Sequence, residues 1–299
     1  MRTLPLILAT GLLPAFAGTA LAQDAAVPPP PQTAAAKAAL LDRVVANEKK
    51  GDEAMNLYER IERVEARKSV SDPLSVEVKV SRVVPAGTGI DHIPTGPDGK
   101  PTDLDAYHSE LLKLERALSW AADDGHAQRD AYEKLARKQK ERDELIDATR
   151  VAFVYNLVST EMRDGRVLYK YSMMPNPAYK PSSRATSIFA KVRGFVWIDP
   201  KAEQVARIEG EVTDDISIGL FLAKVYKGSR FLQERREVAP GLWMPSFSQY
   251  DFEARKFFSS ISVHERTFYS QFHRIGPPKE ALAEIRAELG KPASGISDP

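Results

Sequence analysis

The segment GFVWIDPKAEQVARIEG, residues 194–210, predicts two antiparallel strands joined by a turn. In its first half the apolar residues are consecutive, so Phe195 and Trp197 lie on one face of the strand and Val196 and Ile198 on the other. A Pro-Lys pair marks the turn, and charged residues then alternate with apolar ones. A strand with two apolar faces beside a strand with one wet face is typical of a large curved sheet with a covered middle.

Further strands are predicted on both sides of this pair. Residues 74–84 alternate, with Val76, Val78 and Val80 on one side of a half-buried strand. An Asp-Gly pair beginning at Asp164 indicates a hairpin between two later strands. The remaining predicted strands are spaced closely enough for one antiparallel meander, at residues 151–160, 166–174, 220–225, 231–238, 243–252 and 257–272.

Two helices are inserted between these strands, at residues 102–148. The first has one apolar stripe at helical spacing, and the second is polar over most of its surface. The break at Gly125 indicates a helical hairpin, so the fold class is α+β, with an antiparallel sheet interrupted by that hairpin. A further helix begins at Ala36, with Leu40, Leu41, Val44 and Val45 on one side and Asp42, Arg43, Asn47 and Glu48 opposite.

The first 22 residues are typical of a secretory signal peptide. A basic start at Arg2 precedes an apolar run, and Ala20-Leu21-Ala22 fits the cleavage pattern. The alternative is an uncleaved anchor, although the run is short for a membrane span and is broken by Pro14. No later stretch is long and apolar enough to cross a bilayer, and no cysteine is present to be acylated. We therefore expect a soluble periplasmic protein that is not a lipoprotein.

The sequence divides into four parts. The signal peptide at residues 1–22 is followed by a linker rich in proline and alanine at residues 23–36. Residues 37–277 are expected to form a single domain, because predicted strands lie on both sides of the helical hairpin. Residues 278–299 contain a short helix and a polar, flexible tail.

Composition and motifs exclude several classes of function. The 299 residues carry a net charge of +1, which removes the electrostatic argument for nucleic acid as a partner. The absence of cysteine excludes thiolate catalysis and thiolate metal sites. No nucleophile, phosphate-binding or metalloprotease motif occurs. Two acidic clusters, at residues 123–126 and 214–215, have the donors for a cation or a catalytic pair, but turns explain both more simply. We expect no enzyme activity, no metal site and no cofactor.

Aromatic residues are concentrated in the last third of the chain. In one interpretation they form the core of a twisted sheet. In the other they line an apolar cavity on the concave face, which the helical hairpin closes, and a ligand is held there by hydrophobic burial. The candidate ligand-binding residues in this second interpretation are Phe195, Trp197, Phe221, Trp243, Tyr250 and Phe252 on the sheet and Trp120 on the hairpin.

The strand pair at residues 194–210 also resembles a recurrent segment of the LolA/LolB-like superfamily, which includes periplasmic carriers that sort outer-membrane lipoproteins. Residues 219–230, 241–245 and 47–67 are similar to uncharacterised exported members. The resemblance implies that Met55–Lys68 forms the first strand, although its apolar residues recur every three positions. It also implies an unclosed half-barrel wrapped around helices, with a hydrophobic concave face for acyl chains or another amphiphile.

Two functions from different classes fit these patterns. The first is a soluble periplasmic carrier that binds a lipid, a lipoprotein acyl chain or another amphiphile. The second is a non-enzymatic scaffold of the cell envelope, which holds an envelope protein partner with the charged helical hairpin. Lipid that co-purifies with the protein would favour the carrier. A partner lost on deletion of residues 124–147 would favour the scaffold.

Overall fold

The computed structural model describes residues 27–290, apart from residues 70, 72–74, 219–222 and 257–258. The expected signal peptide, the start of the linker, Phe221 and the C-terminal tail lie outside the described residues. The first helix begins within the expected linker, where the Thr33 hydroxyl accepts a hydrogen bond from the Ala36 amide at 3.1 Å and caps the helix.

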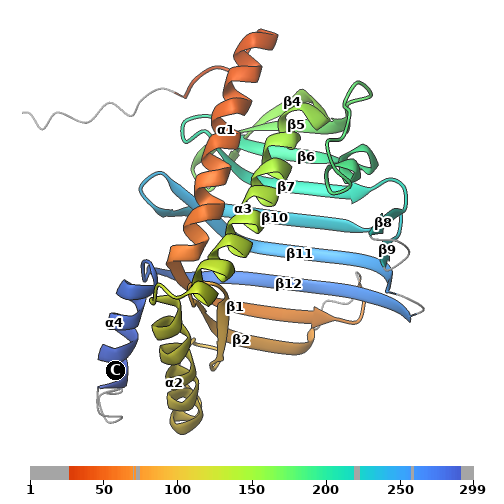
Figure 1. Ribbon diagram of the computed structural model, residues 1–299. Helices are drawn as coiled ribbons and strands as arrows, with labels where there is room; N and C mark the ends of the chain where they lie inside the picture. Colours follow the sequence, from red (N-terminus) through yellow and green to blue (C-terminus); the bar gives the residue numbers. More distant parts are fainter. Residues whose placement is uncertain (1–26, 70, 72–74, 219–222, 257–258, 291–299) are drawn as a thin grey trace, which may run out of the picture.

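The described strands form one open antiparallel sheet of 12 strands (Figure 1). The main path runs β3-β2-β1-β12-β11-β10-β7-β6-β5-β4, with β8 and β9 paired beside β11. The predicted α+β fold with a large, unclosed antiparallel sheet is confirmed, and β1 is a strand where the spacing of three alone favours a helix. The strands are β1 Tyr58–Arg67, β2 Ser75–Pro85, β3 Ile90–Pro94, β4 Phe153–Arg163, β5 Arg166–Pro175, β6 Val192–Asp199, β7 Gln204–Val212, β8 Ile216–Ile218, β9 Ala223–Val225, β10 Arg230–Ala239, β11 Leu242–Lys256 and β12 Ser259–Arg274.

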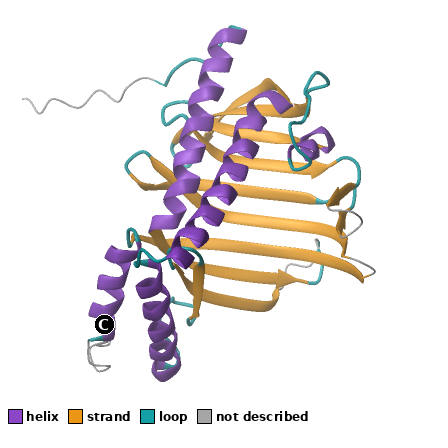
Figure 2. Ribbon diagram, viewed as in Figure 1, coloured by secondary structure: helices purple, strands orange, loops and turns teal. Residues whose placement is uncertain are grey.

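The helices occupy two places around this sheet (Figure 2). α1 (Ala34–Ala54) and α3 (His126–Ala152) run side by side across one face of the sheet. α2 (Leu104–Ala121) and α4 (Pro278–Leu289) pack on each other, with α2 also against β3. We call the face covered by α1 and α3 the inner face of the sheet and the opposite one the outer face. Short 3-10 helices, Met55–Leu57 and Thr186–Lys191, are labelled η1 and η2.

The two inserted helices do not pair with each other as a hairpin. α2 and α3 follow one another end to end across Asp123–Gly125, and each packs on a different helix, α2 on α4 and α3 on α1 (Figure 1). The Tyr132 hydroxyl donates to the Ala121 carbonyl at 2.8 Å and helps to fix the junction. The surface of α3 is mostly polar, so the apolar stripe of α2 would bury little apolar area against it. The stripe of α2 therefore packs on α4 and β3 instead, through Leu111, Leu114 and Leu118.

The two larger of the three hydrophobic clusters among the described residues lie apart from each other. One lies on the inner face, where Leu40, Leu41 and Val44 of α1 meet buried residues of β4, β5 and β6. The other joins α2 and α4 to β2 and β3, and Ala281 and Ile285 of α4 are both 0% exposed there. Helix α4, expected in the same segment as a flexible tail, is therefore part of the folded body.

The first half of β2 is more exposed than its alternation predicts. Val80 is buried, but Val76 and Val78 on the same face are 56% and 47% exposed. The reason is the length of the outermost strand, because β3 pairs only with residues 81–85 of β2. The earlier half of β2 is thus an open edge of the sheet on its β3 side.

Candidate ligand-binding cavity

A cavity of about 250 Å³ lies between the inner face of the sheet and helices α1 and α3. Its roof is formed by Leu41, Val44, Val45 and Glu48 of α1, together with Ile146 of α3. The α1 positions recur at intervals of three and four residues, so they share one side of that helix. Glu48, expected on the polar side opposite the apolar residues, lies instead among the lining residues.

The floor of the cavity consists of residues from neighbouring strands in register. Val196 of β6 pairs with Ile208 of β7, and both line the cavity, as does Ile198 two residues beyond Val196. Phe231 of β10 lines it as well and is opposite Gly210 of β7. Aliphatic side chains at alternate positions of adjacent strands therefore make one continuous apolar floor.

Two glycines facing each other leave room on the inner face. Gly194 of β6 pairs with Gly210 of β7, and Gly210 pairs in turn with Phe231. A Cβ atom at Gly210 would collide with the Phe231 ring, so this ring lies flush against the bare backbone. Because neither glycine has a side chain, the Phe231 ring fills the space above Gly210 on the inner face.

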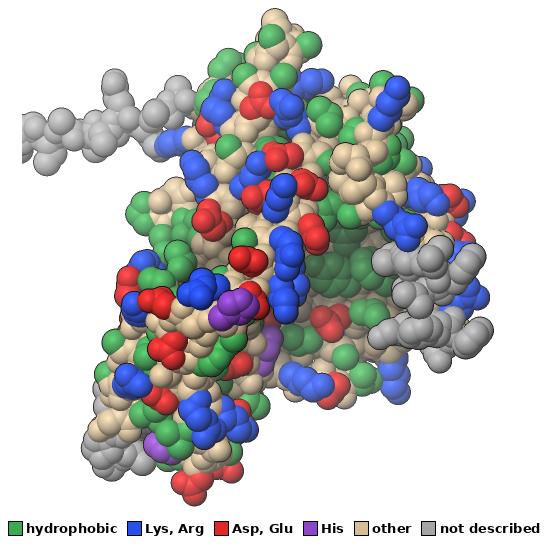
Figure 3. Space-filling view, in the orientation of Figure 1, with side chains coloured by type: hydrophobic (Ala, Val, Ile, Leu, Met, Phe, Trp, Pro, Cys, Tyr) green, Lys and Arg blue, Asp and Glu red, His purple; other side chains and the backbone are tan. Residues whose placement is uncertain are grey.

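The space-filling view shows an apolar hollow on the inner face (Figure 3). Hydrophobic side chains gather in a hollow beside α3, over β10 and its neighbours, and Lys and Arg side chains line the adjacent edge of that helix. A hollow of this kind, largely apolar with a few polar groups, has the composition typical of sites for small molecules.

Tyr250 and Phe252, two of the residues expected to bind a ligand, lie on the inner face. Tyr250 of β11 pairs with Phe231, and its ring lies 5.5 Å from that of Phe252, centroid to centroid. Neither ring is among the lining residues of the 250 Å³ cavity. They extend the apolar surface of the inner face from the cavity towards β12.

Phe195 and Trp197 lie on the outer face, away from the cavity. The Trp197 indole donates to a Glu161 carboxylate oxygen at 2.8 Å, and that hydrogen bond lowers the pKa of Glu161. The Lys170 ammonium lies 4.7 Å from the centroid of the Trp197 ring and 4.9 Å from that of Phe195. The sequence does not show which face of β6 points to the cavity, because both sides of this strand are apolar. In the structure the helices cover the side that carries Val196 and Ile198.

The other predicted aromatic residues also lie elsewhere. Trp243 is 2% exposed, and the Arg166 guanidinium lies over its ring at 5.0 Å. Trp120 is on α2 and 41% exposed, and its carbonyl accepts a hydrogen bond from the Gln128 side chain. Since α2 packs on α4, Trp120 is not part of a lid over the cavity. Phe221 is outside the described residues.

Glu48 of the cavity roof forms an ion pair that joins α1 to the sheet. One carboxylate oxygen of Glu48 contacts the Arg235 guanidinium of β10, which also donates to the Trp243 carbonyl at 2.9 Å. Burial lowers the pKa of Arg235 to about 10, so it is still protonated at neutral pH. The second carboxylate oxygen of Glu48 is buried without a hydrogen-bond partner.

Tyr155 of β4 contributes a titratable group to the cavity wall. Its side chain is buried, and its hydroxyl donates to the Thr149 carbonyl at 2.9 Å. Burial raises the pKa of this hydroxyl far above its ordinary value of 10.0, because the phenolate would lose its hydration.

The stability of the fold is therefore expected to fall above pH 10. A group whose folded pKa is raised contributes its full stabilisation below its ordinary pKa, and loses it as the pH rises beyond that value. Tyr155→Phe should flatten the alkaline slope of the thermal midpoint measured between about pH 9 and pH 12. Part of the slope should remain, because burial also raises the pKa of Tyr107, Tyr169, Tyr171 and Tyr269. An unchanged slope in the variant would contradict the assignment.

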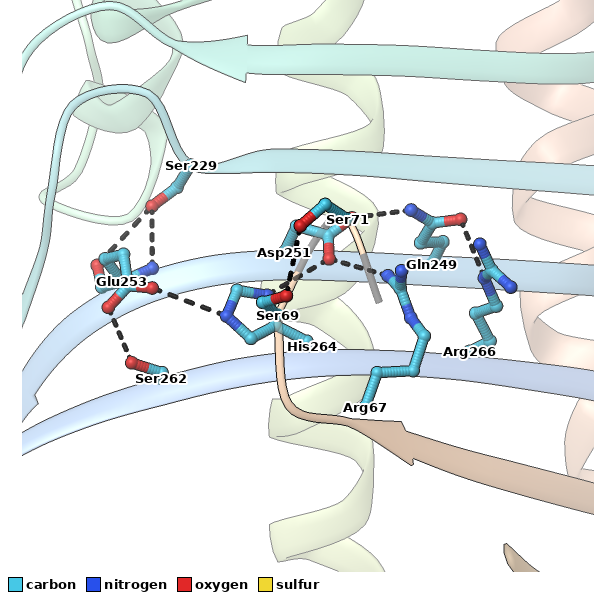
Figure 4. A network of polar contacts seen from close by, with 10 residues as sticks. All are labelled: Arg67, Ser69, Ser71, Ser229, Gln249, Asp251, Glu253, Ser262, His264 and Arg266. Atoms are coloured by element: carbon cyan, nitrogen blue, oxygen red, sulfur yellow. Dashed lines mark hydrogen bonds and ion pairs between the residues drawn. The ribbon is translucent and has the colours of Figure 1, made fainter. Parts of the chain in front are cut away.

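A second group of polar residues lies on the outer face (Figure 4). Asp251 of β11 accepts from the Arg67 guanidinium at 2.7 Å and contacts the nearer ring nitrogen of His264 of β12 at 3.2 Å. The other ring nitrogen of His264 is 3.4 Å from Glu253. These contacts join the end of β1 to β11 and β12, so we interpret the network as a structural brace.

Among the described residues, no group of three or more His, Asp or Glu side chains is placed to hold a metal ion. None of the helices in the described part of the chain combines the length and apolar composition needed to span a bilayer.

No family model matches the chain, and no curated protein matches it. Among solved structures, it is similar to a domain from Vibrio parahaemolyticus described as an outer membrane lipoprotein-sorting protein, with 10% identity and a TM-score of 0.30. That match covers 84% of this chain and 98% of the other. A DUF1329 family protein from Desulfovibrio piger matches with 11% identity and a TM-score of 0.28, over 79% of this chain and 92% of the other.

The description of the first structure, a lipoprotein-sorting protein, agrees with the LolA/LolB-like resemblance noted for residues 194–210. At such TM-scores neither likeness bears on function, which has to be argued from the cavity itself.

Proposed function

We propose that this protein binds a small hydrophobic molecule, or the apolar part of an amphiphile, between α1, α3 and the inner face of the sheet. The observation that supports this most directly is the 250 Å³ cavity with its apolar floor and roof. Its size is just below the usual range of small-molecule pockets, about 300–1,000 Å³. It therefore suits one acyl chain or a compact apolar ligand. Each methylene that leaves water there contributes about 0.8 kcal/mol.

The cellular setting belongs to the same proposal. The N-terminal pattern of residues 1–22 favours export, and a carrier in the periplasm would shield the apolar part of its cargo from water. The cargo we propose is a lipid, a lipoprotein acyl chain or a related amphiphile. Binding of this kind requires no catalytic residue, in line with the absence of a recognisable catalytic motif in the sequence.

The alternative scaffold function depends on the charged helix α3. Several of its charges are already paired with α1: Arg142 with Asp52 at 2.9 Å, Asp147 with Lys49 at 2.6 Å, and Arg150 with Asp42 at 2.6 Å. These pairs hold α3 over the cavity. We therefore assign the charges of α3 to the support of the binding site rather than to the docking of a protein partner. Deletion of residues 124–147 would remove part of the cavity roof together with any docking surface.

The test is the binding of N-phenyl-1-naphthylamine, which fluoresces in apolar surroundings, to the purified full chain. Ile208→Phe places a larger side chain on the cavity floor and should weaken binding by about tenfold, equivalent to about 1.4 kcal/mol. Val154→Phe is the matched control, because Val154 lies between the lining residues Phe153 and Tyr155 of β4, is 40% exposed and does not line the cavity. Its affinity should stay within about twofold of the wild type.

Two results would oppose the proposal. One is a wild-type protein that neither binds the probe nor yields co-purified lipid on extraction and mass spectrometry. The other is an Ile208→Phe variant that keeps both its thermal midpoint and its full affinity for the probe, because the site would then lie elsewhere.

A further inference from the structure

The charges of α3 are divided between two sides of the helix. One side faces α1, where Asp147 pairs with Lys49 and Arg150 with Asp42, both at 2.6 Å. In the shared view of Figures 1 and 3, the apolar hollow of the inner face lies beside α3 on the side away from α1. The charges on that second side are the ones that a molecule in the hollow would meet.

The periodicity of the helix identifies the residues on the hollow side. Lys134, Lys138, Glu141 and Leu145 recur at intervals of four, three and four residues, so they share one side of α3. At about 100° per residue, that side is turned by about 120–180° from Asp147 and Arg150. Leu145 is half-buried, as expected beside an apolar hollow, whereas the three charged residues are exposed.

Lys134 and Lys138 are unpaired cations. Neither makes a hydrogen bond or an ion pair with any residue in the described part of the chain. This holds also for the nearest candidates for a partner, Glu141 on the same side of α3 and Glu265, which is in register with Tyr250 on the inner face. Figure 3 shows Lys and Arg side chains along the edge of α3 that borders the hollow. The two ammonium groups are therefore available to a ligand.

The two lysines lie one chain length away from the cavity. Ile146 of α3 is part of the cavity roof. At a rise of 1.5 Å per residue, Lys138 is about 12 Å and Lys134 about 18 Å from Ile146 along the helix axis. Tyr250 and Phe252 extend the apolar surface of the inner face beyond the cavity. A molecule with its apolar end in the cavity can thus reach the lysines with its other end.

We infer that the ligand is an anionic amphiphile, whose chain lies on the inner face beside α3 and whose carboxylate or phosphate head group binds Lys134 and Lys138. The inference rests on the proposed binding function and narrows it to one class of ligand. An uncharged amphiphile would fill the same apolar space but leave both ammonium groups without a counter-charge. Because the lysines are exposed, the head group remains in contact with water and its charge needs no buried partner.

The experiment compares two probes that have the same chain. Decanoate and 1-decanol are titrated, below the concentrations at which they aggregate, against the protein loaded with N-phenyl-1-naphthylamine, and displacement of the dye is measured. The ratio of the two affinities reports the head group, because the contribution of the chain cancels. Replacing both lysines, Lys134→Gln with Lys138→Gln, should weaken decanoate about fivefold, the effect of two exposed ion pairs. The affinity for 1-decanol should stay within about twofold of the wild type.

Lys140→Gln is the matched control for Lys138→Gln. Lys140 is exposed on the same helix but is turned by about 200° from Lys138, so it lies away from the hollow. Both substitutions remove one positive charge. Lys138→Gln should weaken decanoate about two- to threefold, whereas Lys140→Gln should keep the wild-type affinity.

A salt series on the wild type requires no variant. Raising the NaCl concentration from about 0.02 M to about 0.5 M should weaken decanoate about fivefold, because salt screens exposed charges. The binding of 1-decanol should not weaken, since burial of its chain involves no charge.

The outcomes separate the two proposals. Dye that is displaced by both probes, with a ratio of affinities that neither salt nor the paired lysine substitutions change, overturns the inference and leaves the binding function standing. An equal loss of decanoate affinity in Lys138→Gln and Lys140→Gln overturns the assignment to the hollow side of α3. Failure of the wild type to bind the dye at all overturns the binding function itself. The salt series stands even when a variant does not fold.

Discussion

Asp251→Asn is expected to destabilise the protein by about 3–5 kcal/mol, the range typical of removing one partner from a buried ion pair. Asp251 is the centre of the outer-face network and accepts from Arg67 at 2.7 Å. The side chains of Arg67 and Asp251 are 1% and 6% exposed. Water therefore cannot replace the lost carboxylate, and the Arg67 charge remains in a poorly hydrated place.

The loss also affects two neighbours of Asp251. His264 contacts the same carboxylate oxygen at 3.2 Å, and the Gln249 side-chain amide donates to the other oxygen at 2.5 Å. An asparagine offers one acceptor where the carboxylate offers two, so at least one of these donors loses its partner. The free energy of unfolding is measured by urea denaturation, with the midpoint and slope compared between variant and wild type.

Glu253→Gln is the control for this network. Glu253 contacts His264 at 3.4 Å, but its side chain is 59% exposed, so its loss should cost less than about 1 kcal/mol. A cost below about 1 kcal/mol for Asp251→Asn as well would show that solvent screens the whole network. Combining Asp251→Asn with Arg67→Met should cost less than the sum of the two single changes, because both residues belong to the same buried ion pair.

The sequence indicates the sheet well because alternation is a local property. The strand pair at residues 194–210 appears where its residues predict it. β1 is a strand as the resemblance implies, although the spacing of its own apolar residues favours a helix. The face that binds is harder to predict. Val196 and Ile198 compete with Phe195 and Trp197 as the inward pair, and only the position of α1 and α3 decides between them. Phe195 and Trp197 are the larger pair and are easier to notice in the sequence. In the structure they lie on the outer face, where Trp197 contacts Lys170 and Glu161.

Two further features depend on contacts between residues far apart in the chain. The apolar stripe of α2 packs on α4, about 170 positions later in the sequence, so the spacing within α2 predicts a stripe but not its partner. Glu48 is read as a solvent-facing charge because carboxylates are rarely buried without a partner. Its partner, Arg235, lies on β10, and no local pattern connects the two residues. The spacing from Leu41 through Val44 and Val45 to Glu48 is the one signal that places this residue on the cavity side.

Gly194→Ala is expected to destabilise the protein by about 3 kcal/mol, at the upper end of what overpacking costs. A Cβ atom at Gly194 would collide with the backbone carbonyl of Glu209 on the adjacent strand β7. Backbone atoms in a paired strand cannot move aside as a flexible side chain does, so the two strands must separate locally. The pairing of β6 with β7 would weaken where it forms the cavity floor.

Gly89→Ala is the matched control for this change. Gly89 is exposed in the turn between β2 and β3, and an added Cβ would meet no atom within 4 Å. The substitution there should be neutral, or stabilising by up to about 1 kcal/mol through the reduced freedom of the unfolded chain. Thermal unfolding of both variants beside the wild type measures the contrast. Equal midpoints for Gly194→Ala and Gly89→Ala would show that β6 and β7 tolerate a side chain at this point. In that case the close approach of the two strands would not be what requires a glycine in the segment GFVWIDPKAEQVARIEG.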